Sequence, residues 1–261
     1  MEHLASHGYV IAAPVHPFDN LNAVRAADPV DVGRNLENRP RDVSFIIDTL
    51  LARAADANDS LFGRIDGDRI GVIGHSYGGY TALAVAGGSL NGPEFEQFCA
   101  EDTITTDVFD TCSVYASVVE VDGPFPADTR NADPRVSAVV AMAPPIPFLG
   151  DGVADVETPV MVIAGEVDIP INYDRHVVAY FDALPPPRYL LSYETGGHLA
   201  MTTLCAFPRQ DNTPNQDCAV YSRADKRFVT AMMGRHLRDV LAYDAELASF
   251  GEGPVHLETV R

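Results

Sequence analysis

The chain has 261 residues, of which 46% are hydrophobic and 21% charged, so it can form a sizeable core and is not a disordered or fibrous protein. Its formal net charge of −19 argues against nucleic-acid binding, and no apolar run reaches the roughly 20 residues of a membrane helix. The closest approach to a basic cluster, residues 223–227, contains Asp225 and is typical of a solvated helix face.

Short apolar segments alternate with amphipathic stretches, which is typical of a mostly parallel sheet flanked by helices. The segments expected to be strands are 9–15, 69–74, 136–143, 159–164 and 188–193. The segments expected to be helices are 40–55, 79–87, 173–184 and 223–247. The pattern predicts one α/β domain over residues 1–261, with an inserted excursion at about 88–134 and a loop at about 199–222. In the last helix, the side chains expected to face the core are Phe228, Met232, Leu237, Val240 and Leu241.

Residues 74–78 read Gly-His-Ser-Tyr-Gly, a G-x-S-x-G motif between a predicted strand and a predicted helix. This context indicates a sharp turn that exposes the hydroxyl of Ser76, with Gly74 and Gly78 avoiding collisions with the adjoining strand and helix. The start of the helix directs backbone N–H groups at the reaction centre, and the N–H of Tyr77 is the expected oxyanion donor.

A serine hydroxyl needs a base to remove its proton, and among eight histidines His198 is the best candidate. It follows the predicted strand 188–193 across a glycine-containing run that can place an imidazole over the end of the sheet. His16 is a candidate for lining the pocket, and His75 for packing support. The remaining histidines are expected on the surface: His3, His7, His176, His236 and His256.

The base needs a carboxylate to fix its tautomer, and Asp168 follows strand 159–164 at the carboxyl edge of the sheet. Glu166 and Asp174 are the fallback acids. The order Ser76, Asp168, His198 is the order typical of α/β-hydrolases.

These motifs carry a resemblance to bacterial α/β-hydrolases of the platelet-activating-factor acetylhydrolase and dienelactone-hydrolase-like group. It rests on LASHGYVIAAPVHP (4–17), RPRDVSFIIDTLLAR (39–53), GRIDGDRIGVIGHSYGGYTALA (63–84), the GEVDIP turn and the GGH loop. The resemblance covers most of the chain outside 88–130. Dienelactone hydrolases proper use a cysteine where this chain has Ser76, which argues against lactone chemistry.

The resemblance also implies a strand that ends in a His-Gly-type loop, lies between segments 9–15 and 69–74, and supplies a second oxyanion donor. No segment before Met1 is present to form it, so we expect the fold to lack its first strands, as a truncated or mis-called gene start would produce; an evolved short form is the alternative. A leader peptide would have been lost with that front segment.

Together these features predict a serine carboxylic-ester hydrolase that forms an acyl-enzyme and uses no cofactor or metal. Its substrates are expected to be short-acyl esters, because nothing in the sequence resembles a long apolar lid. Three alternatives stay open: a polyester hydrolase, a prolyl-oligopeptidase-type peptidase suggested by SYGGY (76–80), and a catalytically impaired hydrolase-fold scaffold.

The four cysteines form no C-x-x-C pair, which argues against structural zinc. Local pairing, Cys99 with Cys112 and Cys205 with Cys218, is our choice among three connectivities. The alternative is four reduced thiols in a cytoplasmic enzyme. Disulfides imply export, so we expect a secreted or periplasmic protein.

Overall fold

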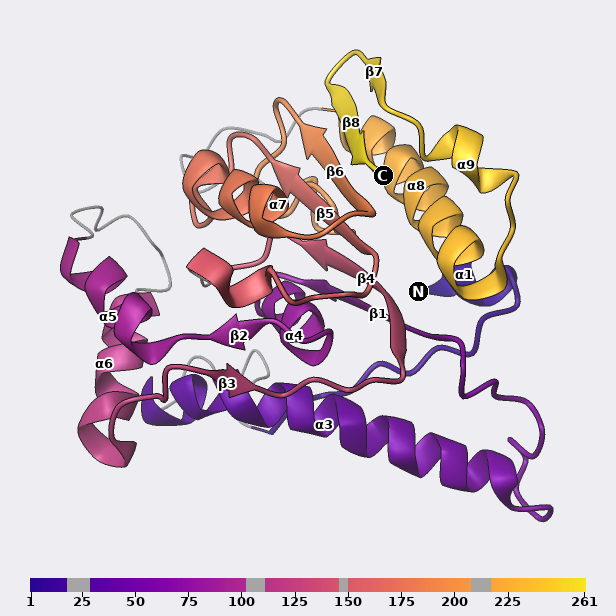
Figure 1. Ribbon diagram of the computed structural model, residues 1–261. Coiled ribbons are helices and arrows are strands. Elements are labelled where there is room, and N and C mark those ends of the chain that lie inside the picture. The colour runs from indigo at the N-terminus through magenta and orange to yellow at the C-terminus, as the bar shows by residue number, and fades with distance from the viewer. Residues whose placement is uncertain (18–28, 102–110, 146–149, 208–216) are drawn as a thin grey trace.

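The computed structural model describes residues 1–17, 29–101, 111–145, 150–207 and 217–261. Its centre is a six-stranded sheet in the order β1-β4-β5-β6-β8-β7 (Figure 1). The first four strands in this order run parallel, and β8 joins them antiparallel. The strands are β1 (Ile70–His75), β4 (Val136–Met142), β5 (Val160–Gly165), β6 (Arg188–Tyr193), β7 (Phe250–Glu252) and β8 (Val255–Val260). The predicted α/β fold with a mostly parallel sheet is therefore confirmed.

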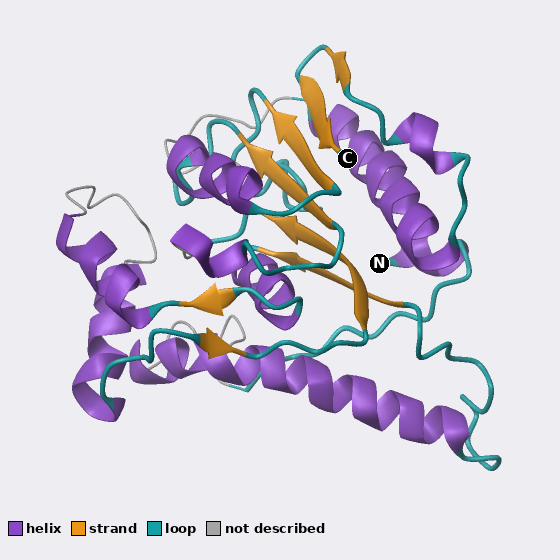
Figure 2. Ribbon diagram, in the orientation of Figure 1, coloured by secondary structure: helices purple, strands orange, loops and turns teal. Residues whose placement is uncertain are grey.

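Helices cover both faces of this sheet (Figure 2). The helices α4 (Tyr77–Val85) and α7 (Ala179–Ala183) pack on one face, and α3 (Pro29–Ala55) packs against α4. The long α8 (Cys218–Arg238) covers the other face, where it contacts β1, β4 and β8. Because both faces are covered, β5 is buried along its whole length. None of the described helices is long and apolar enough to cross a bilayer.

The remaining short elements lie at the edges of this architecture. The helix α1 (Glu2–Ser6) precedes α3, a π-helix (Tyr173–Val178) leads into α7, and α9 (Tyr243–Glu246) follows α8. A 3-10 helix (Gly150–Val153) lies between β4 and β5. The predicted helix 173–184 is thus a π-helix continued by α7.

Within its described residues, the predicted excursion holds two helices and a separate pair of short strands. The helices are α5 (Gly92–Glu101) and α6 (Thr111–Asp122), and β2 (Ser89–Leu90) pairs antiparallel with β3 (Thr129–Arg130). The helix α6 packs against α3, and the predicted disulfide Cys99–Cys112 joins α5 to α6.

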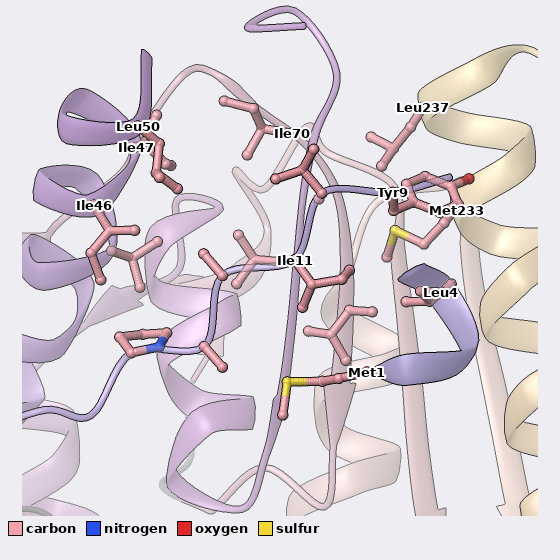
Figure 3. Close-up of a pocket in the computed structure, with 18 of the residues that line it drawn as sticks. Met1, Leu4, Tyr9, Ile11, Ile46, Ile47, Leu50, Ile70, Met233 and Leu237 are labelled. Atoms are coloured by element: carbon pink, nitrogen blue, oxygen red, sulfur yellow. The ribbon is translucent and has the colours of Figure 1, made fainter. Parts of the chain in front are cut away.

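The prediction of a buried strand at 9–15 is wrong. This segment has no regular secondary structure, and Val10 and Val15 are 53% and 77% exposed. A cavity of about 580 Å³ lies between it and β1, with apolar walls from α3 and α8 (Figure 3). In the described part of the chain, segment 9–15 therefore has no strand to pair with, and a lone strand is unstable. The sequence resemblance places a further strand where this cavity lies. That strand stays a prediction.

The predicted closing helix 223–247 ends early. Helix α8 stops at Arg238, because Asp239 adopts a left-handed conformation with φ of 54°. Phe228, Met232 and Leu237 are buried as predicted, but Val240 and Leu241, beyond the break, are 38% and 66% exposed. The hairpin β7–β8, which adds two strands to the sheet, is not among the predicted elements.

Candidate active site

The loop between β1 and α4 makes a tight turn at Ser76. The serine has φ of 54° and ψ of −124°, a strained backbone for a residue with a Cβ, and it precedes the first turn of α4. Gly74 permits this turn, because a Cβ there would lie 1.9 Å from the carbonyl oxygen of Gly78. The turn lifts the Ser76 side chain above the carboxyl ends of the parallel strands.

The sequence predicts that a side chain at position 78 would collide with the adjoining elements, but in the structure this collision arises at Gly79. A Cβ on Gly78 would meet only an Arg39 nitrogen, at an ordinary 3.7 Å. A Cβ on Gly79 would lie 2.8 Å from the carbonyl oxygen of Met142. The first turn of α4 therefore approaches the end of β4 through Gly79, which lies outside the five-residue motif.

The structure brings the three predicted side chains together. Ser76 follows β1, Asp168 follows β5, and His198 lies in the loop after β6, so all three meet at the carboxyl edge of the sheet. The Oγ of Ser76 is 2.9 Å from Nε2 of His198. The Nδ1 of His198 is 2.9 Å from Oδ2 of Asp168. The result is an unbroken hydrogen-bonded chain from carboxylate to hydroxyl.

The carboxylate of Asp168 is shielded and fully engaged. Its side chain is 1% exposed, against 15% for His198. Its second oxygen, Oδ1, accepts a hydrogen bond of 3.1 Å from the backbone N–H of Ile171. Because both oxygens have donors, the side chain has one well-defined orientation toward the imidazole.

The loops that carry Asp168 and His198 contact each other through their backbones. The N–H of Val167 donates to the carbonyl oxygen of Gly196 at 3.2 Å. A Cβ on Gly165 would lie 2.0 Å from that same oxygen, so only glycine allows the approach. This contact fixes the separation between the carboxylate and the imidazole.

The fallback acids lie elsewhere. Glu166 accepts a hydrogen bond of 2.8 Å from the hydroxyl of Ser192 rather than from His198. Asp174 lies on the π-helix before α7. Neither carboxylate takes part in the hydrogen-bonded chain of the site.

Three histidines differ from expectation, and the first, His236, is partly buried rather than on the surface. His176, predicted on the surface, is 6% exposed. His16 is among the residues that line the cavity between segment 9–15 and β1, and its Nδ1 lies 2.7 Å from Oδ2 of Asp42. Burial lowers the pKa of His16, while the hydrogen bond to Asp42 opposes that effect. That cavity touches Gly74 and Gly78 but neither Ser76 nor His198, so His16 lies behind the turn rather than at the hydroxyl.

The side chain of Tyr77 anchors the start of α4. Its hydroxyl donates to the backbone carbonyl of Val32 at 2.9 Å, and the guanidinium of Arg39 lies 4.7 Å from its ring centroid. Arg39 also donates through Nε to the hydroxyl of Thr81 at 2.8 Å. Arg39 was not predicted from the sequence to contact the site. The one indication was its place in segment 39–53, which carries the family resemblance. These contacts tie the helix behind Ser76 to α3.

The second predicted disulfide, Cys205–Cys218, joins the segment after His198 to the first residue of α8. Both bridges close loops of the same sequence separation, 13 residues. Removing either pair by double substitution to serine should therefore lower the free energy of unfolding by a similar amount, roughly 3 kcal/mol. Only Cys205→Ser/Cys218→Ser should also lower kcat, because only that bridge restrains the segment next to His198.

Denaturant unfolding and activity assays on both double variants, at a temperature where each is folded, will test this. Equal kcat losses in the two double variants would contradict a specific role for Cys205–Cys218.

Comparison with known proteins places the chain in a large enzyme superfamily. No curated protein matches it. Its sequence matches the alpha/beta hydrolase family over residues 3–255, which is nearly the whole chain. Together with the parallel sheet and the tight turn after β1, this match shows that the chain belongs to the alpha/beta hydrolase family and is a hydrolase.

Proposed function

We propose that the chain is a serine carboxylic-ester hydrolase that works through an acyl-enzyme. One observation carries the proposal: the hydrogen-bonded chain from Asp168 through His198 to the hydroxyl of Ser76, at 2.9 Å for each step. This is the arrangement that activates a serine hydroxyl in unrelated hydrolases. Within the family, the quoted sequence segments favour the platelet-activating-factor acetylhydrolase and dienelactone-hydrolase-like group.

In the proposed first half-reaction, Oγ of Ser76 attacks the ester carbonyl carbon while Nε2 of His198 takes the hydroxyl proton. Asp168 stabilises the imidazolium that forms. The carbonyl oxygen becomes an oxyanion, and the N–H of Tyr77 at the start of α4 is the proposed donor to it. His198 then gives its proton to the leaving alcohol, and the acyl group remains on Ser76.

In the second half-reaction, water replaces the alcohol. His198 takes a proton from water, the resulting hydroxide attacks the acyl carbon, and His198 returns the proton to Oγ of Ser76 as the carboxylic acid leaves. These steps use side chains of this chain alone. The proposed partner is therefore an ester substrate, small or polymeric.

We propose a secreted or periplasmic location, which the two disulfides support, because such bridges persist in oxidising compartments.

The test compares four substrates: p-nitrophenyl acetate, p-nitrophenyl dodecanoate, an aromatic polyester film and an acyl-peptide p-nitroanilide. We expect kcat/KM to be highest for the acetate. Preference for the anilide would indicate a peptidase, and release of soluble products from the film a polyester hydrolase. A folded protein that turns over none of them and reacts with no fluorophosphonate probe would contradict the proposed function and favour a non-catalytic scaffold.

A further inference from the structure

The residue before the nucleophile, His75, contacts the loop that carries the proposed base. It is the last residue of β1, and its Nε2 lies 2.7 Å from the backbone carbonyl oxygen of His198. The two imidazole rings are 4.8 Å apart between centroids and inclined by 47°. The sequence suggested packing support for His75, and the structure adds a hydrogen bond to His198 itself.

We propose that His75 is a positioning residue: its Nε2–H holds the carbonyl of His198 and so keeps that imidazole in line between Asp168 and Ser76. The inference rests on the proposed function, because it concerns the geometry of the same site.

The chemistry of the bond fixes the state of His75. A backbone carbonyl only accepts hydrogen bonds, so Nε2 of His75 must carry the proton. Burial and the neighbouring His198 lower the pKa of His75 to about 4. At neutral pH the ring is therefore neutral, with its hydrogen on Nε2.

The neutral state of His75 matters because the neighbouring His198 changes its charge during the proposed reaction. During the proposed reaction His198 becomes a cation, and a second positive ring at this separation would disfavour that cation. A neutral His75 holds the loop without opposing the charge that forms on His198.

The loop needs such a restraint. Two glycines, Gly196 and Gly197, precede His198, and glycine backbones are conformationally permissive. Gly196 is held by the N–H of Val167, and the carbonyl of Gly197 accepts from the N–H of Ala200. The bond from His75 acts one residue further, on the peptide group of His198 itself.

Three variants separate the hydrogen bond from ring packing. His75→Gln retains an N–H donor near the position of Nε2, His75→Phe retains a ring without a donor, and His75→Ala removes both. The matched control is His236→Phe. Burial also lowers the pKa of His236 to about 4, and its Nε2 lies 3.0 Å from the hydroxyl oxygen of Tyr189 on β6 rather than near Ser76.

With p-nitrophenyl acetate we expect His75→Phe and His75→Ala to lower kcat on the order of 10²-fold, with KM little changed, because a small displacement of a reacting group has an effect of that size. His75→Gln should recover most of the loss, and His236→Phe should retain the wild-type kcat. The inference is overturned if His75→Phe matches wild type, or if His75→Gln is as impaired as His75→Ala.

A second measurement does not need turnover or a variant that folds. Nitrogen-15 NMR of the histidine rings in the wild-type protein should show His75 as the neutral Nε2–H tautomer at pH 7. An Nδ1–H tautomer or a protonated ring would overturn the inference. If the wild type hydrolyses no ester, the proposed function fails, and the NMR spectrum still decides the hydrogen bond of His75.

Discussion

Replacing Ser76 with alanine will lower kcat for p-nitrophenyl acetate on the order of 10⁴–10⁶-fold and abolish labelling by a fluorophosphonate probe. The proposed covalent intermediate forms on Oγ of Ser76, and alanine offers no nucleophile there. Stopped assays with a large excess of enzyme will give the residual rate. Mass spectrometry of the labelled wild-type protein will locate the probe.

The matched control is Ser117→Ala on α6, whose hydroxyl bonds the Ser113 carbonyl within that helix. This variant should label and turn over as wild type does. Wild-type activity in Ser76→Ala would refute the mechanism, and a probe attached to another residue would move the nucleophile there.

Replacing Asp168 with asparagine will lower kcat by about 10⁴-fold. The N–H of Ile171 already donates to one oxygen of Asp168, so the amide oxygen of asparagine will take that place. The amide nitrogen then faces Nδ1 of His198 as a donor and forces the ring hydrogen onto Nε2. In that tautomer His198 cannot accept the proton of Ser76.

Two further variants test the choice of acid. Glu166→Gln and Asp174→Asn should keep kcat close to wild type, since neither carboxylate hydrogen-bonds to His198 in the structure. Unfolding curves of all three variants will separate loss of catalysis from loss of folding. A kcat for Asp168→Asn near that of wild type, with Glu166→Gln impaired, would assign the acid to Glu166.

The centre of the sheet could be predicted because β4, β5 and β6 are buried on both faces. The segments 136–143 and 159–164 are almost wholly apolar, as is typical of strands covered on both faces. They correspond to β4 and β5 in the structure. The relative places of Ser76, Asp168 and His198 could also be anticipated, because each follows a parallel strand and such strands end at one edge.

Other features depended on contacts that a local pattern does not contain. Segment 9–15 has the composition of a strand, but strand structure requires a neighbour. The end of α8 depends on one residue, Asp239, with a left-handed backbone. The hairpin β7–β8 is short, and its pairing partner β6 lies more than 50 residues earlier in the chain. The bond from His75 to His198 spans 123 residues.

The position of β1 in the sheet bears on how the enzyme would lose activity. Within the described residues β1 pairs only with β4, and Ile73 is 38% exposed. Native proteins open in partial steps, and a strand held along one side opens at a lower free-energy cost than strands held along both. If fluctuations frayed this flank and broke the bond from the N–H of Ser76 to the carbonyl of Met142, Ser76 would move away from Asp168 and His198 while β4, β5 and β6 remained folded. Inactivation would then follow the local stability of one margin of the molecule rather than the global stability of the fold.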